Sequence, residues 1–374
     1  MRWTLGDRPE RLAILTSTLG GGGAQRSMIR LAGGIAERGY AVDLVLRRAE
    51  GHYADEVQNG VRVVDLDAGR MLFSVPALVR YLRRERPQAV LAALNYVNIV
   101  GLWARRVAGV RTRFVVSERN TLSPAASHRR TWRELVRPKL IGRFYRWADG
   151  IVAVSEGVAS DLAAVTGLPR SRIDVIPNPV ITPRLKQMAR APVGHPWFGE
   201  GEPPVVLALG RLAPQKDFDT LIRAFAAVRE RRVARLLILG EGPEREALES
   251  TIARLDLGSD VELPGWVANP YPFLIRSAAF VLSSRWEGLP GALIEALFCG
   301  IPVIATDCPS GPREILDGGR HGRLVPVGES DALALAIDQA LAGQIPRPGR
   351  DSWEPYEQEI VVGHYLDLLL GDRA

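Results

Sequence analysis

The chain has 374 residues, of which 47% are hydrophobic and 24% are charged, and its net charge is +6. This length and apolar content suit two folded domains and exclude disorder as the main feature. No run of eighteen apolar residues occurs and residues 1–10 are polar, so we expect neither a membrane-spanning helix nor a signal peptide. Two cysteines, Cys299 and Cys308, are too few for a disulfide framework, and we expect buried thiols in a cytoplasmic protein.

Short apolar runs alternate with helical patterns along the chain, which is typical of parallel sheets built from strand-helix-strand units. The strands predicted in the first half are 12–15, 42–46, 61–66, 89–92, 114–116 and 151–154, and Ser155 should cap the helix after the last of them. The strands predicted in the second half are 205–209, 236–239, 261–262, 280–282, 303–304 and 324–325. The pattern predicts an α/β protein with two doubly wound, Rossmann-like sheets.

A glycine-rich loop, Gly20 to Gly23, follows the first predicted strand and opens a helix. Its exposed N–H groups suit a phosphate or an acceptor, which makes Gly21, Gly22 and Gly23 candidate ligand contacts. The four consecutive glycines do not have the spacing of a dinucleotide-binding fingerprint. A flexible structural turn is the alternative.

Basic residues are concentrated in the first half, where residues 1–190 carry a net charge of +15 and the rest −9. Many of them lie in 127–147, where arginines alternate with aromatic and aliphatic residues at helical spacing. Such a helix suits an anionic cytoplasmic membrane surface, and Pro138 should kink or split it. The alternative is a solvated face over an ordinary packed helix, and we expect no nucleic-acid partner. The candidate membrane contacts are Arg129, Arg130, Trp132 and Arg133.

The domain boundary should follow Ile176-Pro177-Asn178-Pro179, where two prolines stiffen an extended connector, and precede the Pro- and Gly-rich segment 192–204. We therefore predict an N-terminal domain over 1–182 and a second domain over 183–354. The last segment, 355–374, contains an amphipathic helix over 356–370.

An anion-binding design follows the buried strand 205–209, where a glycine turn leads to two cations, Arg211 and Lys216. Arginine can grip phosphate oxygens in a bidentate manner and lysine can add a point charge, which suits a diphosphate. The chain contains only three lysines against 45 arginines, so a lysine here is unusual. An ordinary solvated loop is the alternative.

The most informative segment is 283–296, in which Glu287 and Glu295 flank a Gly-Leu-Pro-Gly turn that opens an apolar helix. The free N–H groups of such a helix start form a seat for phosphate. The carboxylates suit hydrogen bonds from sugar or ribose hydroxyls. The implied ligand carries both phosphate and sugar.

At these residues the chain resembles the retaining glycosyltransferases of family four, which have the GT-B fold of two Rossmann-like domains facing a central cleft. The resemblance covers nearly the whole chain, and the order of its motifs is more specific than any one of them. These motifs are Gly20 to Gly23, Val154-Ser155-Glu156, Ile176-Pro177-Asn178-Pro179, Gly210-Arg211 with Lys216, Gly240-Glu241-Gly242-Pro243, Glu287 with Glu295, and Gly300-Ile301-Pro302-Val303-Ile304-Ala305.

The resemblance implies transfer of a sugar from a nucleotide-sugar donor, with retention at the anomeric carbon and without a metal ion or another cofactor. By resemblance, Arg211 and Lys216 hold the donor diphosphate, Glu295 binds the ribose and Glu287 meets the donor sugar. Arg211, Lys216 and Glu287 are thus the candidate catalytic residues. The last helix is expected to cross back onto the first domain. The other candidate donor contacts are Gly210, Gly288, Leu289, Pro290, Gly291 and Gly311.

One departure from the family pattern follows the strand 114–116, where many members have a histidine and this chain has Ser117-Glu118-Arg119-Asn120. The segment resembles relatives that build lipid-linked or core oligosaccharides from N-acetylhexosamines. Glu118, Arg119 and Asn120 are candidate acceptor contacts, with Glu118 for hydroxyls and Arg119 for a phosphate. A buried Glu-Arg structural pair is the alternative.

Other polar patterns point to structure. Asp65-x-Asp67 and Asp217-x-Asp219 have a metal-dependent spacing but fall at a strand end and a helix start, and the five histidines are scattered, so we expect no metal site. Ser310 could cap a helix, while the backbone of Gly311 could reach the donor sugar.

The sequence thus predicts a glycosyltransferase that uses UDP-GlcNAc, UDP-GalNAc or a UDP-hexose and a membrane-associated acceptor, either a lipid-diphosphate-linked sugar or lipopolysaccharide core. Its expected location is cytoplasmic, peripheral on the inner face of the plasma membrane. The alternatives are a GT-B UDP-sugar epimerase or hydrolase and a non-catalytic sugar-nucleotide-binding protein.

Overall fold

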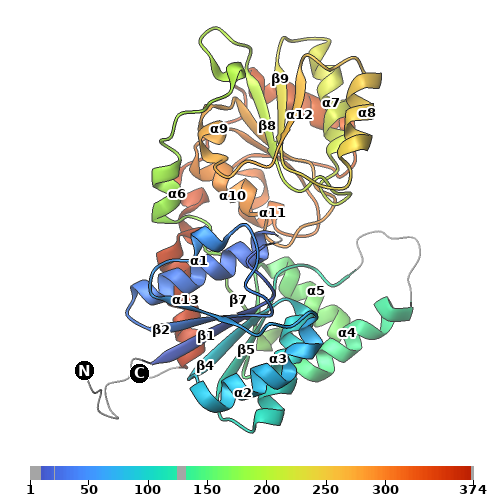
Figure 1. The fold of residues 1–374 in the computed structure, drawn as a ribbon. Helices are drawn as coiled ribbons and strands as arrows, with labels where there is room; N and C mark the ends of the chain where they lie inside the picture. Colours follow the sequence, from blue (N-terminus) through green and yellow to red (C-terminus); the bar gives the residue numbers. More distant parts are fainter. Residues whose placement is uncertain (1–9, 21, 124–131, 372–374) are drawn as a thin grey trace. The chain divides into compact units, whose positions relative to one another are not determined.

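The computed structural model describes residues 10–20, 22–123 and 132–371, with the main chain alone for 132–138. The chain forms two compact units, one of residues 1–180 with 356–374 and one of residues 181–355 (Figure 1). The boundaries expected at 182 and 354 lie within two residues of these divisions.

The first unit contains a seven-stranded parallel sheet in the order β3-β2-β1-β4-β5-β6-β7. Six of its strands are at the predicted positions, and the seventh, β7, was not predicted because its three residues, Ile-Asp-Val, give too short an apolar run. The strands are β1 (Arg11–Thr16), β2 (Ala41–Leu46), β3 (Val61–Asp65), β4 (Ala89–Ala93), β5 (Arg113–Glu118), β6 (Gly150–Ala153) and β7 (Ile173–Val175).

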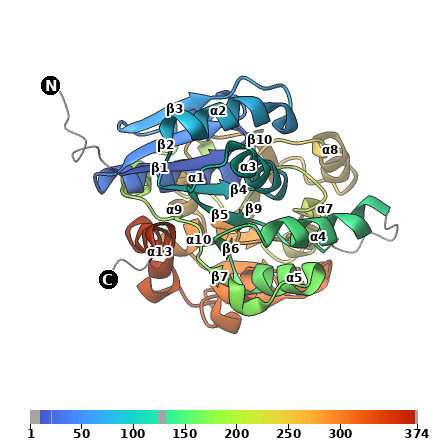
Figure 2. The same cartoon turned by 90° about the horizontal axis from the view of Figure 1, so that it is seen from below.

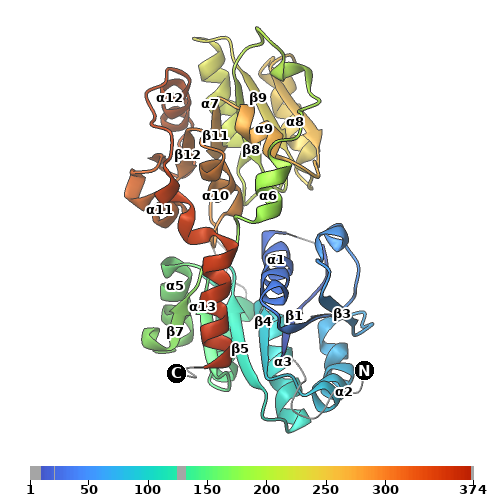
Figure 3. The ribbon, with the colours of Figure 1, turned by 90° about the vertical axis from the view of Figure 1, so that its left-hand side faces the viewer.

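Helices cover both faces of this sheet because alternate strand residues point to opposite sides. Leu12 and Ile14 of β1 join the core formed with α1 and α13, and Figure 3 shows α13 beside α1 in front of the strands. On the other face α2, α3, α4 and α5 follow one another (Figure 2). The helices are α1 (Gly23–Glu37), α2 (Val75–Glu85), α3 (Asn95–Ala108), α4 (Trp132–Tyr145), α5 (Glu156–Thr166) and α13 (Gln358–Leu370).

Two helix expectations have different outcomes. Ser155 caps α5 as predicted, because its side chain accepts a hydrogen bond from the amide of Val158. Of the two predicted effects of Pro138, a kink or a split, the split was wrong, because α4 is one element through this proline. The last helix, α13, lies in the first unit.

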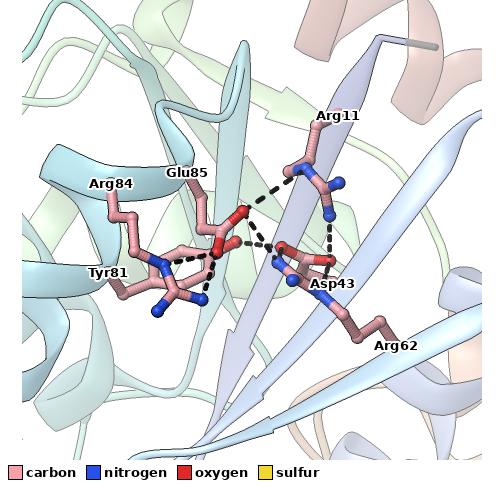
Figure 4. A network of polar contacts seen from close by, with 6 residues as sticks. All are labelled: Arg11, Asp43, Arg62, Tyr81, Arg84 and Glu85. Atoms are coloured by element: carbon pink, nitrogen blue, oxygen red, sulfur yellow. Dashed lines mark hydrogen bonds and ion pairs between the residues drawn. The ribbon is translucent and has the colours of Figure 1, made fainter. Parts of the chain in front are cut away.

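A buried carboxylate joins three strands to α2 in the first unit (Figure 4). Asp43 of β2 is fully buried and accepts hydrogen bonds from Arg11 at 2.7 Å, Arg62 at 2.5 and 2.8 Å and the Tyr81 hydroxyl at 2.7 Å. Glu85 pairs with Arg62 at 3.2 Å. Burial together with the Asp43 charge raises the pKa of Tyr81, so its hydroxyl remains a donor.

Asp43→Ala should destabilise the first unit strongly, by about 3–5 kcal/mol, because it leaves Tyr81 and two arginines without their buried acceptor. The measurement is the thermal unfolding profile, since a two-unit chain need not unfold in one step. The control is Glu249→Ala, which removes a surface ion pair to Arg245 and should change stability by less than about 1 kcal/mol. Equal effects of the two substitutions would show that the network contributes little.

The second unit contains a six-stranded parallel sheet in the order β10-β9-β8-β11-β12-β13, and all six strands were predicted. A hydrophobic core packs α7, α8 and α12 on one face of the sheet. The predicted α/β class with two parallel sheets is confirmed. The strands are β8 (Val205–Leu209), β9 (Arg235–Leu239), β10 (Val261–Gly265), β11 (Ala279–Leu282), β12 (Val303–Thr306) and β13 (Arg323–Val325). The helices are α6 (Pro183–Met188), α7 (Phe218–Arg229), α8 (Arg245–Arg254), α9 (Tyr271–Arg276), α10 (Gly291–Phe298), α11 (Pro312–Ile315) and α12 (Ser330–Leu341).

Candidate functional site

Two loops that follow neighbouring strands of the second unit, β8 and β11, are joined directly. The hydroxyl of Ser283 donates to the carbonyl of Lys216 at 2.7 Å, and the amide of Arg285 donates to the carbonyl of Gln215 at 2.8 Å. The Gln215 side chain in turn donates to the carbonyl of Trp286 at 2.8 Å. The two motifs singled out in the sequence therefore form one structure at the carboxyl edge of the sheet, where ligands of such folds bind.

The loop after β12 is attached to the same structure. The Glu287 amide donates to the Pro309 carbonyl at 2.8 Å, and the Ser310 amide donates to the Glu287 carbonyl at 3.0 Å. The Ser310 hydroxyl donates to the Gly288 carbonyl at 3.2 Å. Since Gly311 occupies the N-cap of α11, Ser310 does not cap that helix.

The central contact of the site is an ion pair between Lys216 and Glu287. The Lys216 ammonium lies 2.6 Å from Oε1 of Glu287, and the Ser284 hydroxyl donates to the same oxygen at 2.7 Å. Both charged side chains are largely buried. Oε2 of Glu287 accepts from no described residue, which leaves this oxygen available for a hydroxyl of a ligand.

The glycine before this motif lets the lysine stem lie against the backbone. Gly210 has a φ of +156°, and a Cβ there would lie 3.0 Å from Cε of Lys216. Arg211, the next residue, is exposed and forms no ion pair or hydrogen bond with the part of the chain that the structure describes. Arg211 is therefore an unpaired cation in the same loop as Lys216, which is paired with Glu287.

The turn that opens α10 is packed against the loop after β12. Gly311 has a φ of +99°, and a Cβ there would lie 2.8 Å from both the Gly288 carbonyl oxygen and Cδ of Pro290, so only glycine fits. Leu289 is buried and Pro290 is the N-cap residue, so the helix begins at Gly291. The amides of Leu293 and Ile294 donate to the Pro290 carbonyl, whereas those of Gly291 and Ala292 have no acceptor in the described chain, which suits an anion.

Glu295 lies one turn into α10 and is buried, with 7% of its surface exposed. Its Oε1 accepts a hydrogen bond from the Tyr271 hydroxyl of α9 at 3.0 Å. Tyr271 was not predicted as a site residue, because a tyrosine in a short apolar helix gives no signal beyond core packing. It holds one carboxylate oxygen of Glu295 in place.

The two cysteines lie close to the two glutamates. Burial together with the Glu295 charge raises the pKa of the Cys299 thiol to about 12, and burial together with the Glu287 charge raises that of Cys308 to about 12. Both thiols are therefore protonated at neutral pH, and neither is suited to act as a nucleophile.

Three of the four aspartates in the pairs with a metal-dependent spacing are engaged in structural contacts. Asp217 pairs with Arg285 at 2.9 Å, and this hydrogen bond raises the pKa of the arginine. Asp219 accepts from Arg223 and Thr251, and Asp65 accepts from two backbone amides. Within residues 10–20, 22–123 and 132–371, no cluster of three or more His, Cys, Asp or Glu side chains is arranged to hold a metal ion.

In the first unit, Glu118 and Arg119 lie at the carboxyl end of β5 and are both buried, but they do not pair with each other. Glu118 accepts a hydrogen bond from the Tyr145 hydroxyl. Arg119 has only neutral described partners, Asn178 at 2.6 Å, the Tyr365 hydroxyl at 3.2 Å and the sulfur of Met28 at 3.3 Å. The alternative of a Glu-Arg structural pair was therefore wrong.

Four buried polar atoms in this part of the first unit lack hydrogen-bond partners among the described residues. They are Nε of Arg119, Oγ of Ser117, Oδ1 of Asn98 and Oγ1 of Thr16. These atoms lie at the ends of β5 and β1 and in the first turn of α3, around β4, and buried polar groups are normally paired. Asn98 and Thr16 were not predicted, since single polar residues in apolar segments give no sequence signal. The exposed side chain of Asn120 accepts from the next amide, that of Thr121, and from no other described residue.

Of the other ligand and membrane contacts predicted in this unit, only some lie among the described residues. Gly22 is the N-cap of α1, where its amide donates to the Gln25 side chain at 3.3 Å, and Gly22 and Gly23 both border open space. Gly21, Arg129 and Arg130 lie outside the described residues, as do the side chains of Trp132 and Arg133.

Two family models match the chain. One, described as Glycosyltransferase Family 4, matches residues 21–184, and the other, described as Glycosyl transferases group 1, matches residues 203–343. The chain belongs to this glycosyltransferase family. Each motif on which the resemblance rests lies within or directly beside one of these two matched segments.

Several relatives are similar over most of this glycosyltransferase. A lipopolysaccharide core biosynthesis glycosyltransferase of Rhizobium meliloti is 27% identical over 93% of this chain and 96% of its own length. An N-acetylgalactosaminyltransferase of Campylobacter jejuni, named for a diphospho-undecaprenol substrate, is 30% identical over 66% of this chain and 65% of its own. An uncharacterized glycosyltransferase of Methanocaldococcus jannaschii is 37% identical, but over only 46% of this chain and 43% of its own length.

Solved structures support the fold. An Anabaena protein crystallised with UDP and glucose has a TM-score of 0.77 at 20% identity, covering 96% of this glycosyltransferase and 99% of that chain. The predicted GT-B fold is therefore confirmed. No helix in the described ranges has both the length and the apolar character needed to span a bilayer.

Proposed function

We propose that this chain is a retaining, metal-independent glycosyltransferase that moves a hexose or N-acetylhexosamine from a UDP-sugar to a membrane-associated glycan acceptor. The observation that carries the proposal is the joined loops after β8, β11 and β12, which place Lys216 against Glu287 beside the start of α10. The relative that uses a diphospho-undecaprenol substrate and the relative of lipopolysaccharide core biosynthesis support the acceptor class.

In this proposal the second unit holds the donor. Arg211 and Lys216 bind the diphosphate together with the first amides of α10, while Glu295 accepts from the ribose and Oε2 of Glu287 accepts from a sugar hydroxyl. The acceptor oxygen bonds to the anomeric carbon as the bond to the diphosphate oxygen breaks, and the leaving diphosphate takes the acceptor proton. The two cations stabilise the charge that develops on the leaving group.

The first unit supplies the acceptor site in this proposal. Arg119 is a buried cation without a described counter-ion, and it follows directly on Glu118 at the carboxyl end of β5. A buried unpaired cation is costly unless an anion completes its environment, which suits the phosphate of a lipid-diphosphate sugar. The enzyme would then work at the inner face of the plasma membrane, where such an acceptor is held.

A donor panel tests this function. We expect the purified chain, assayed in the presence of EDTA, to transfer sugar from one UDP-sugar to a lipid-diphosphate sugar, and NMR of the product should show the same anomeric configuration as in the donor. GDP- and ADP-sugars serve as competing donors. Turnover without an acceptor would instead indicate an epimerase or hydrolase, and binding without consumption would indicate a non-catalytic protein.

A further inference from the structure

The outer surface of α2, α3 and α4 combines exposed apolar side chains with cations. Of the eight large apolar residues that are exposed in the described part of the first unit, six lie on these helices or in the 3-10 turn Met71–Ser74 before α2. They include Phe73 (67% exposed), Val107 (53%) and Trp103 (45%). We call this surface the α2–α4 face, and its members are Leu72, Phe73, Arg80, Arg83, Arg84, Tyr96, Trp103, Arg106, Val107, Lys139, Leu140, Arg143, Arg146 and Trp147.

Side-chain contacts make this face continuous. Arg83 of α2 donates to the carbonyls of Val107 and Ala108 at the end of α3, at 3.0 and 3.2 Å. Arg106 of α3 lies over the ring of Trp147, 4.9 Å from its centroid. Trp103 and Trp147 pack edge to face, with centroids 5.6 Å apart, and Phe144 packs between the same helices.

The charge of the face is predominantly positive. Seven exposed cations lie on it, whereas α2, α3 and residues 139–149 contain two acidic residues, and both are already paired: Glu85 with Arg62 and Arg84, and Asp149 with Arg105. Two hollows are lined by these cations. One of about 440 Å³ is lined by Pro76, Val79, Arg80, Arg83 and Arg84, and one of about 340 Å³ by Lys139, Gly142, Arg143, Arg146, Trp147 and Thr166.

We propose that the α2–α4 face docks this glycosyltransferase on an anionic lipid bilayer, with the apolar side chains at the level of the headgroups and the hollows receiving lipid phosphates. Aromatic and aliphatic side chains interspersed with arginines suit such an interface. The inference deepens the membrane partner given under Proposed function and rests on it for its biological purpose. It moves the contact from residues 129–133 to a three-helix surface.

Charge complementarity selects the bilayer over other occupants. A second copy of the chain on this face would bring seven cations against seven cations, which disfavours a symmetric dimer. A nucleic acid would satisfy the cations but would leave Val107, Leu140 and Phe73 in water. A bilayer surface provides both phosphates and an apolar layer.

Vesicle flotation of the full chain, without donor or acceptor, tests the proposal. Wild type should float with vesicles that contain about 30 mol% phosphatidylglycerol and not with pure phosphatidylcholine. The test variant, Arg106→Glu with Val107→Glu, should lose more than about tenfold in the partition coefficient. The matched control, Arg231→Glu with Val233→Glu, makes the same two changes at exposed residues of the second unit and should lose less than about twofold.

A further variant and an activity assay separate the loss of membrane docking from the loss of folding or of activity. Phe73→Glu, in the 3-10 turn before α2, should also weaken flotation, which covers the case that the double variant does not fold. In detergent, sugar transfer to an acceptor should be the same for wild type, for the double variant and for Phe73→Glu. A wild-type enzyme that transfers no sugar in this assay would show that the proposed function is wrong, whatever the flotation result. Equal flotation of test and control variants would overturn the proposal, as would flotation that ignores anionic lipid, binding of a nucleic acid in place of vesicles, or a dimer that the test variant converts to monomers.

Discussion

Lys216→Ala should lower kcat/KM by more than about a hundredfold, which corresponds to about 2.7 kcal/mol of lost transition-state stabilisation. The ammonium lies 2.6 Å from Glu287 in a largely buried position, where a charge on a leaving diphosphate is poorly screened by water. The measurement is steady-state transfer at saturating acceptor. A loss of less than about threefold would refute the role of this lysine.

The unpaired charge of Glu287 in this variant requires a control. Removing Lys216 leaves Glu287 without its cation, so the remaining carboxylate alone could repel the diphosphate. The double variant Lys216→Ala with Glu287→Gln removes this repulsion, and we expect it to stay as inactive as the single variant. Recovery of activity would mean that Lys216 serves only to neutralise Glu287. Lys186→Ala, the other lysine of the second unit, should change kcat/KM by less than about threefold.

Arg119→Gln should lower kcat/KM for the acceptor by more than about thirtyfold while the affinity for UDP stays the same. The cation is buried among neutral partners, so its charge has no structural counterpart in the described chain and is free to pair with a phosphate. Arg119→Lys keeps the charge and should retain more activity than Arg119→Gln.

Two observations separate this role from a structural one. Glutamine has a shorter reach toward Asn178 and Tyr365 than arginine, but it removes a buried charge without a described counter-ion, so the unfolding temperature of Arg119→Gln should fall only slightly. Arg113→Gln neutralises an arginine at the other end of β5, where it donates to the Leu368 carbonyl, and should leave acceptor kinetics unchanged. If Arg119→Gln and Arg119→Lys lose activity equally, or if UDP affinity falls with them, Arg119 does not act as an acceptor cation.

Much of the fold followed from hydrophobic patterning, because buried parallel strands leave continuous apolar runs. Strands such as Val205–Leu209 are fully buried and stand out in the sequence, whereas Ile173–Val175 is short and has a polar centre. Pro138 shows the limit of a local rule, since a helix can continue through a proline when its surroundings support it.

The candidate site was predictable where its residues form motifs that follow strands. Lys216 and Glu287 are 71 positions apart, and only the sheet order brings their loops together. Their direct pairing was not predicted, because the sequence shows which edge the residues share and not which side chains touch. No such signal exists for Tyr271, because its role depends on its hydrogen bond to Glu295. The same is true of Asn98 and Thr16, which stand out only because the structure gives their buried oxygens no partner.

The central claim is that the second unit holds the donor diphosphate on Arg211 and Lys216. A crystal structure with an intact UDP-sugar tests it most directly. The account predicts diphosphate oxygens within hydrogen-bond distance of both cations, a sugar hydroxyl on Oε2 of Glu287 and a ribose hydroxyl on Glu295. A donor whose diphosphate contacts neither Arg211 nor Lys216 would contradict it.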